Sequence, residues 1–396
     1  MTARDAVRGA LAAAALAVAG AAAAQGAAGD EIVLGMVAPF SGAAKEMGQA
    51  VRTGVEVAFA AQNAAGGVGG RRLRLIAMDD GYEPARTSAA MKELVEGKKV
   101  FGVIGNVGTP TAAVAVPYAN EKGVLFFGAV SGAPLLRNDP PDRYVFNYRA
   151  SYGEETAAIV RYLVEVRRIA PSEIAVFAQE DAFGDAGFEG VARVMRHYRR
   201  DPAKVLRVGY KRNTADVEEA VQGILRHARG LKAVVMVATY KPAARFVEKL
   251  KDAGHGRLVF SNVSFVGSNE LAEELTQLGP GYADGVVVTQ VVPNPLAKAS
   301  ATLRYQKELK ANAPGEKPGF LSLEGWVAAR LLIEGLQRAG KNVNTEAVVE
   351  ALEGIKALDL GLGVPLTFAP SEHQASHKIW GTVMDGKGEF RSLELE

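Results

Sequence analysis

The chain has 396 residues, of which 48% are hydrophobic and 23% are charged, a composition typical of a globular protein long enough for two domains. Lys and Arg number 46 and Asp and Glu 44, so the chain lacks the basic excess that is typical of nucleic-acid-binding proteins. The sequence has no cysteine, which excludes disulfides, thiol nucleophiles, thiolate metal ligands and a lipid-modified N-terminal cysteine.

The first residues have the pattern of a secretory signal peptide. Arg4 and Arg8 precede an apolar run from Ala10 to Ala24, which ends in three alanines. The run is shorter than the ~20 apolar residues that cross a bilayer, so we expect a signal peptide over residues 1–24. We therefore expect a periplasmic protein without a lipid anchor.

After residue 30, short apolar runs alternate with longer amphipathic ones. The runs typical of strands are 32–37, 73–78, 100–104, 124–128, 174–178, 205–210, 233–238, 258–261 and 286–291. Helical spacing is found at 47–65, 84–96, 152–168, 186–199, 216–229, 242–253, 297–311 and 320–338, and strand-like pieces close the chain at 379–384 and 390–393. This alternation predicts an α/β fold with parallel sheets and right-handed crossovers.

Two sheets are expected rather than one, because nine or ten strands approach the practical limit of an open twisted sheet. Proline-containing stretches at 137–150 and 290–295 interrupt the alternation and are candidates for passages between two lobes. We expect lobe 1 to consist of residues 30–149 and 290–365, and lobe 2 of residues 150–289 and 366–396.

Signatures of catalysis and of metal binding are weak in this sequence. The glycine run Gly66–Gly70 lies between a predicted helix and a predicted strand, which is the reverse of a dinucleotide-binding loop. His373 and His377 are four residues apart, but Pro370 and Ser371 precede them and no Glu-x-x-His pattern is present, so a surface loop is favoured over a zinc site, which needs three or four ligands. Asp181 and Asp185 suit helix capping better than a glycosidase pair. We predict neither a cofactor nor a metal, and no enzymatic activity.

Binding signatures lie where predicted strands end. The strand 100–104 leads into a glycine-rich loop in which Thr109 suits a helix N-cap, and a helix N-terminus at such a place can bind a carboxylate. Ser131 follows the next strand, while Phe183 and Tyr240 follow strands of the expected second lobe. Ligands of open α/β sheets bind beyond the carboxyl ends of the strands. Simple capping and half-buried packing remain the alternative interpretations.

Together these segments resemble the Leu/Ile/Val-binding family of periplasmic substrate-binding proteins of ABC transporters. The resemblance covers essentially the whole chain after the signal peptide and is carried by Ile32–Gly35, Pro39–Gly42, Gly54–Asn63, Gly66–Arg71, Asp79–Asp80, Gly105–Thr111, Ser131–Ala133, Phe183–Gly184 and Tyr240. It implies a type I periplasmic-binding-protein fold, with two doubly wound parallel-sheet lobes joined by a three-strand hinge. It also implies ligand capture by closure, delivery to ABC permease subunits and a monomeric state.

The resemblance also implies a set of ligand-binding positions. The family's carboxylate-holding hydroxyl matches Thr109, its ammonium-contacting groups match Val130 and Ser131, and its aromatic wall matches Phe183 and Tyr240. The full set of matching positions is Met47, Gly108, Thr109, Thr111, Val130, Ser131, Phe183 and Tyr240. Met47 stands where amino-acid binders have a tyrosine at the mouth of the cleft.

This sequence departs from the family's pattern where an acidic residue should face the ligand ammonium. The stretch 262–264 reads Asn-Val-Ser, and a buried ammonium without a carboxylate is costly. Glu324 is a candidate substitute from another element. Tyr152, which follows Arg149 closely in sequence, is a further candidate, with hinge packing as its alternative role. Phe183 stands where a tyrosine is usual.

We therefore expect a periplasmic solute receptor for a small amino-acid-like ligand, or for a carboxylate or amide with an apolar or aromatic body. The alternatives are a sensory ligand-binding protein that docks on a membrane receptor and, less favoured, a hydrolase that uses the cleft. The sequence leaves the identity of the ligand open.

Overall fold

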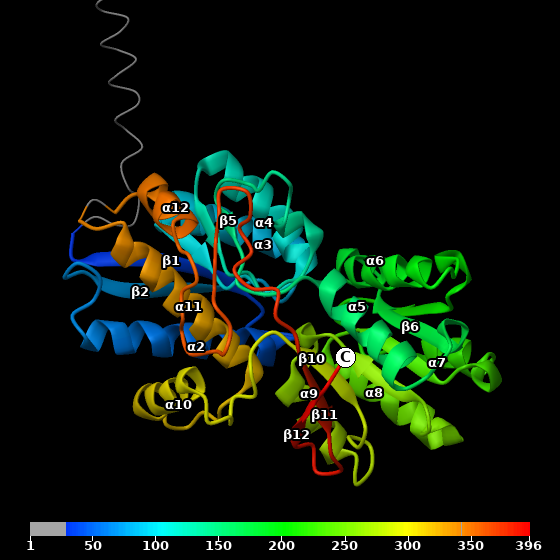
Figure 1. Ribbon diagram of the computed structural model, residues 1–396. Helices are drawn as coiled ribbons and strands as arrows, with labels where there is room; N and C mark the ends of the chain where they lie inside the picture. The colour runs from blue at the N-terminus through cyan, green and yellow to red at the C-terminus, as the bar shows by residue number, and fades with distance from the viewer. Residues whose placement is uncertain (1–28, 342) are drawn as a thin grey trace, which may run out of the picture.

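The computed structural model describes residues 29–341 and 343–396, and the expected signal peptide over 1–24 lies outside them. Within the described residues the strands form two separate sheets, and the chain folds into two halves side by side (Figure 1). The expected two-lobed α/β architecture is therefore confirmed.

The first half contains a five-stranded sheet in the order β2, β1, β3, β4, β5. All neighbouring strands in it are parallel. The strands are β1 (Glu31–Ala38), β2 (Arg72–Asp79), β3 (Gly102–Ile104), β4 (Leu125–Phe127) and β5 (Val145–Phe146). The helices of this half are α2 (Lys45–Ala64), α3 (Pro84–Lys92), α4 (Thr109–Lys122), α10 (Ser300–Asn312), α11 (Phe320–Arg338) and α12 (Thr345–Glu353).

Glycines allow α2 and α11 to pack closely against each other. A Cβ atom on Gly54 would lie 1.9 Å from the carbonyl oxygen of Ser322, and one on Gly325 would lie 2.4 Å from the carbonyl oxygen of Val51. Only glycine fits at both positions, because nothing in the facing backbone can move aside cheaply. The chain therefore brings its residues 45–64 and 320–338 into one layer beside the first sheet.

The second half contains a seven-stranded sheet in the order β12, β11, β10, β9, β8, β6, β7. Only β11 runs antiparallel to its neighbours β10 and β12. The strands are β6 (Ile174–Gln179), β7 (Arg207–Tyr210), β8 (Ala233–Val237), β9 (Val259–Asn262), β10 (Val287–Gln290), β11 (Trp380–Met384) and β12 (Phe390–Leu393). The helices are α5 (Tyr152–Arg161), α6 (Ala182–His197), α7 (Glu218–Leu225), α8 (Tyr240–Leu250) and α9 (Ser268–Gln277).

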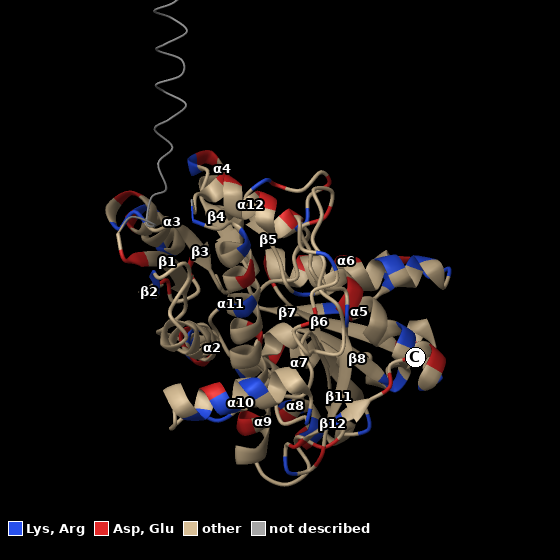
Figure 2. Cartoon of the chain, turned by 60° about the vertical axis from the view of Figure 1, so that its left-hand side comes forward, with Lys and Arg blue, Asp and Glu red and all other residues tan. Residues whose placement is uncertain are grey.

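The strands β6 and β8 are buried along their whole length, as strands between two helix layers must be. The rings of Phe177 on β6 and Phe246 on α8 stack with centroids 4.0 Å apart. Charged residues of both signs are interspersed along the outer helices, for example along α10 (Figure 2). Among the described residues, no helix is both long and apolar enough to cross a membrane.

The described chain passes between the halves after β5, after β10 and before β11. The third passage begins later than expected, because residues 366–375 pack against the first sheet. Phe368 lies 5.2 Å from Phe146 between ring centroids, and His373 lies 3.8 Å from it. Asn147 also pairs with Gln374 in a parallel bridge. The other lobe boundaries stay predictions.

Several sequence-based expectations need correction. His373 does not lie in a surface loop: its side chain is buried, and its Nδ1 lies 3.0 Å from the carbonyl oxygen of Val145. His377 is exposed, as expected. The helices α9 and α12 were not predicted from the sequence, and the two residues of β5 lie in the proline-containing stretch that interrupts the alternation.

Candidate functional site

The loop after β3 ends in a sharp turn that places the hydroxyl of Thr109. The N-cap of α4 is Gly108 rather than Thr109, because the backbone at this position has φ +108°, which favours glycine. Thr109 is instead the first residue of the helix. A Cβ atom on Gly108 would lie 2.2 Å from Cε2 of Tyr82, so the glycine also lets the Tyr82 ring pack against this turn.

Thr109 and Ser131 come together at the carboxyl ends of neighbouring strands. Their hydroxyl oxygens are 2.7 Å apart, and both side chains are buried. Thr111 and Val130, the other two expected site residues near this loop, form hydrogen bonds within the first half. The Thr111 hydroxyl donates to the carbonyl oxygen of Val107 at 2.7 Å, and the carbonyl oxygen of Val130 accepts from the amide of Gly108 at 3.1 Å.

Tyr152 occupies the first turn of α5, directly after the first passage between the halves. Ser151 caps this helix: its hydroxyl accepts from the amide of Glu154, whose carboxylate accepts from the Ser151 amide at 2.7 Å. The Tyr152 hydroxyl is buried and has no hydrogen-bond partner of regular geometry among the described residues. Burial raises its pKa to about 12, although the Arg149 charge and the nearby hydroxyls of Ser131 and Thr109 oppose the rise.

Four aromatic rings join the two halves beside these hydroxyls. Phe183, on α6, lies 5.1 Å from Tyr152 and 4.7 Å from Phe265 between ring centroids. Tyr82, from the first half, lies 6.3 Å from Phe265. We call Tyr82, Tyr152, Phe183 and Phe265 the aromatic cluster. All four residues are at most 1% exposed, so the aromatic cluster is closed to solvent in this conformation.

Tyr240 and Met47 form a second contact between the halves. The Tyr240 hydroxyl donates to the carbonyl oxygen of Ala43 at 2.7 Å and also contacts the Glu46 carboxylate. A Cβ atom on Gly267 would lie 3.5 Å from Cγ of Met47 and from Cδ1 of Tyr240. The two expected site residues therefore lie at the same place, on opposite halves.

A carboxylate that was not predicted from the sequence, that of Glu270, also lies at this second contact. Oε2 of Glu270 would lie 3.0 Å from a Cβ atom on Gly267, and it is buried without a hydrogen-bond partner in the described part of the chain. The pKa of Glu270 is raised to about 7, chiefly by burial; its own backbone amide opposes the rise, and the nearby carboxylates of Glu46 and Glu273 add to it.

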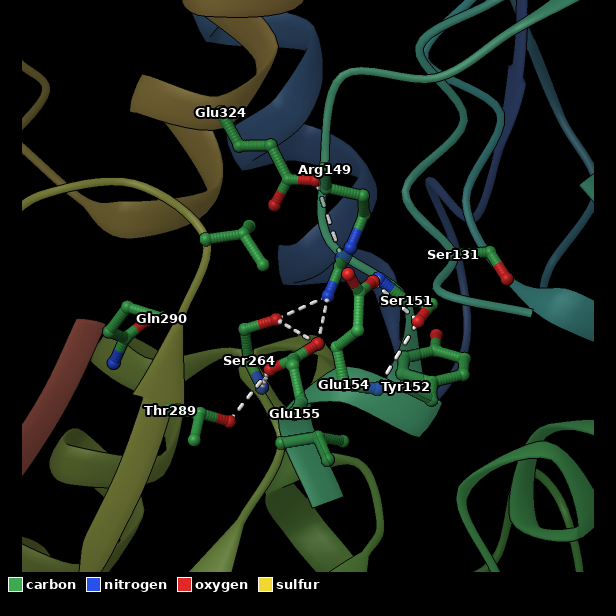
Figure 3. A network of polar contacts seen from close by, with 12 residues as sticks. Ser131, Arg149, Ser151, Tyr152, Glu154, Glu155, Ser264, Thr289, Gln290 and Glu324 are labelled. Carbon is green, nitrogen blue, oxygen red and sulfur yellow. Dashed lines mark hydrogen bonds and ion pairs between the residues drawn. The ribbon is translucent and has the colours of Figure 1, made fainter. Parts of the chain in front are cut away.

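Arg149 is the centre of a buried ion-pair network at the first passage (Figure 3). Its Nη2 lies 2.8 Å from Oε1 of Glu155, and its Nη1 lies 3.3 Å from Oε1 of Glu324. Burial disfavours the charged guanidinium, but the two carboxylates more than compensate and raise the pKa of Arg149. Burial raises the pKa of Glu324, and the neighbouring Glu155 adds to the rise.

The network also includes the segment where the resemblance places an acidic residue. The Arg149 guanidinium contacts the Ser264 hydroxyl, and Oε2 of Glu155 accepts from the Ser264 amide at 2.8 Å and from the Thr289 hydroxyl at 2.7 Å. Asn262 is buried and bonds to the backbone of Ala238. The segment 262–264 thus supplies no acidic side chain, and Glu324, the candidate substitute, is paired with Arg149.

The expected site residues thus divide into three groups. Thr109, Ser131, Tyr152 and Phe183 lie together at the junction of the halves, Met47 and Tyr240 lie at the second contact, and Gly108, Thr111 and Val130 shape the loop. Glu324 lies apart from these three groups, in the ion-pair network of Arg149. The missed neighbours are Tyr82, Glu155, Phe265 and Glu270. Phe265 follows the carboxyl end of β9, so the rule that selected Tyr240 also applies to it. Glu155 and Glu270 lie on helices, and nothing in the sequence pattern of these helices indicates that the two side chains lie near the site.

The other expected chemistries find little support in the geometry. Asp181 caps α6 by accepting from the amide of Phe183 at 3.0 Å, whereas Asp185 pairs with Arg207. The two aspartates therefore have separate structural roles. In the described ranges, no group of three or more His, Cys, Asp or Glu side chains is arranged to hold a metal ion.

Comparison with known proteins finds similarity along nearly the whole chain. Residues 31–389 match the family described as periplasmic binding protein. A Leu/Ile/Val-binding protein homolog 3 from Brucella melitensis is 24% identical over 343 residues, which cover 86% of this chain and 87% of the relative.

Two solved structures illustrate the fold. A possible leucine/isoleucine/valine-binding protein from Rhodopirellula baltica has a TM-score of 0.87 and 37% identity, over 93% of this chain and 98% of that one. A solute-binding protein of an ABC transporter from R. palustris, in complex with benzoate, has a TM-score of 0.77 and 18% identity, over 92% of this chain and 95% of that one. This likeness confirms the type I periplasmic-binding-protein fold expected from the sequence.

Proposed function

The chain belongs to the periplasmic binding protein family, and we propose that it is a solute receptor that captures a small ligand between its two lobes and delivers it to an ABC importer. The observation that supports this proposal is the junction of the halves. There the Thr109 and Ser131 hydroxyls of one half lie beside the aromatic cluster, to which both halves contribute.

Closure of the lobes is the step that would retain the ligand. A ligand that contacts both lobes binds the closed conformation better than the open one, and only this difference shifts the equilibrium. The passages after β5, after β10 and before β11 would act as the hinge. The aromatic cluster is almost inaccessible in the present conformation, so separation of the lobes must precede entry.

The class of ligand is proposed from the junction together with the relatives. A small carboxylate, amide or amino-acid-like molecule with an apolar or aromatic body suits two hydroxyls beside four aromatic rings. Relatives are named for leucine, isoleucine and valine, and one structural neighbour holds benzoate. Both kinds of ligand carry a carboxylate on an apolar body.

A thermal-shift screen of the refolded mature protein tests this function. A ligand at ~1,000 times its dissociation constant should add about 4 kcal/mol to the free energy of unfolding. We expect a raised midpoint with one member of a panel of amino acids, aromatic and short-chain acids, and amides. Recovery of the unchanged ligand after denaturation would support a receptor, and any turnover would contradict it.

A second experiment separates transport from sensing. Tagged protein is expected to co-purify with ABC permease subunits from membranes in the presence of its ligand. Co-purification with a sensor kinase instead would support the sensory alternative, which the fold alone does not distinguish from transport.

A further inference from the structure

We infer that Arg149 makes the junction between the lobes selective for anionic ligands that carry no ammonium group. This inference deepens the proposed function, on which it rests, by naming the charge of the ligand. It is carried by two features of the described residues: the polar groups left without a partner, and the pairing of the nearby carboxylates.

The unpartnered groups at the junction are hydrogen-bond donors. Nε of Arg149 is buried without a partner among the described residues, and the buried hydroxyl of Tyr152 has no partner of regular geometry there, although the hydroxyls of Ser131 and Thr109 lie near it. The two side chains are adjacent, since the Arg149 guanidinium carbon lies 5.5 Å from the centroid of the Tyr152 ring. A buried donor without an acceptor is costly. A ligand that brings acceptor oxygens would remove this cost.

The carboxylates nearby are already engaged. Glu155 accepts from Arg149, from the amide and hydroxyl of Ser264 and from the hydroxyl of Thr289, which uses the capacity of both its oxygens. Glu324 is paired with Arg149. An ammonium group placed beside these carboxylates would therefore compete with a guanidinium that is held in place by the fold.

A second arginine adds a positive charge beside these paired carboxylates. Nη1 of Arg137 donates to the carbonyl oxygen of Ser131 at 3.2 Å, and its Nη2 donates to that of Arg149 at 2.8 Å. Burial lowers the pKa of Arg137 to about 10, so the group stays charged at neutral pH. The two guanidinium groups offset the negative charges of Glu155 and Glu324, which are paired with Arg149, so these carboxylates attract an ammonium group only weakly.

Matched sets of probes test the inference on the full mature chain. One set is 3-phenylpropanoate, 3-phenylpropanamide and phenylalanine, and the other is 4-methylpentanoate, 4-methylpentanamide and leucine. Within each set the apolar body is shared and only the charged groups differ. Calorimetric titration at pH 7.5 should show the acid binding at least about 10-fold more tightly than the amide and about 100-fold more tightly than the amino acid.

Two variants test which donors are responsible. Tyr152→Phe removes only the buried hydroxyl, and we expect it to weaken the binding of the acid about 5-fold to 10-fold and that of the amide less. Tyr118→Phe, which removes a hydroxyl that bonds to Glu96 on the outer surface, is the matched control. Arg149→Lys keeps the charge beside Glu155 but loses Nε, and should weaken the acid about 10-fold without creating affinity for amino acids.

The outcomes distinguish the inference from the proposed function. If an amino acid or an amide binds as tightly as its acid, the inference is wrong, the receptor function stands, and Glu324 becomes the candidate partner of an ammonium group. If no member of either set, and no member of the wider screening panel, binds up to 10 mM, both the inference and the proposed function are refuted. Acid binding that Tyr152→Phe leaves unchanged would also overturn the role assigned to this junction.

Discussion

Replacement of Glu270 by glutamine should stabilise the protein at alkaline pH and have little effect at acid pH. In the folded protein the pKa of Glu270 is raised from 4.5 to about 7, chiefly by burial. The folded state therefore binds more protons than the unfolded state between these values, and the stability contributed by this group falls as pH rises from 4.5 through 7. Glutamine has the same shape and is neutral throughout.

The size of the effect follows from the pKa difference. A pKa difference of 1 between the folded and unfolded states corresponds to about 1.4 kcal/mol. Ionised Glu270 would therefore cost up to about 3 kcal/mol if its side chain were fully enclosed. Its side chain keeps part of its surface in solvent, although Oε2 is buried, and we therefore expect about 2 kcal/mol. Glu270→Gln should raise the free energy of unfolding by this amount at pH 8 and by less than about 0.5 kcal/mol at pH 4.5.

Urea unfolding of the wild type and the variant at pH 4.5, 6 and 8 measures this difference directly. Glu219→Gln is the control, because Glu219 has an exposed side chain on another helix and is not among the groups that shift the pKa of Glu270. An equal stability difference at pH 4.5 and pH 8 would refute the assignment of a buried, protonated carboxyl at this position.

Three further variants test the site and the packing beneath it. Thr109→Ala should weaken the binding of acid probes by about 5-fold to 10-fold and that of matched amides less; equal losses in titration would argue against a carboxylate at this hydroxyl. Tyr240→Phe removes the hydroxyl that bonds across the lobes, so calorimetry should show affinity about 5-fold weaker while the thermal midpoint stays nearly unchanged; unfolding on purification would instead indicate a core residue. Gly190→Ala should cost about 2 kcal/mol or more in urea unfolding, because its Cβ atom would lie 2.1 Å from Oγ1 of Thr156, whereas a Cβ atom on the control Gly230 meets nothing within 4 Å.

Much of the fold could be predicted because its signals are local. Apolar runs such as 233–238 are buried on both faces, and this shows in the sequence without knowledge of any neighbour. The position of Thr109, Ser131, Phe183 and Tyr240 beyond strand ends follows from the same alternation. The cap at Gly108 was missed because the choice depends on a backbone angle, which the serine- and threonine-based capping rule does not contain.

The contacts between charged and polar side chains in the site could not be predicted, because they join residues far apart in sequence. Arg149 meets Glu324 across 175 positions and Ser264 across 115, and no periodicity links such positions. The raised pKa of Glu270 likewise depends on burial against Gly267 and on Glu46 from the other half. The sequence by itself determined the two sheets and the loops that carry polar groups. Only the tertiary structure decided which charges neutralise each other, because Coulomb and desolvation energies depend on distance and burial, and long-range packing sets both.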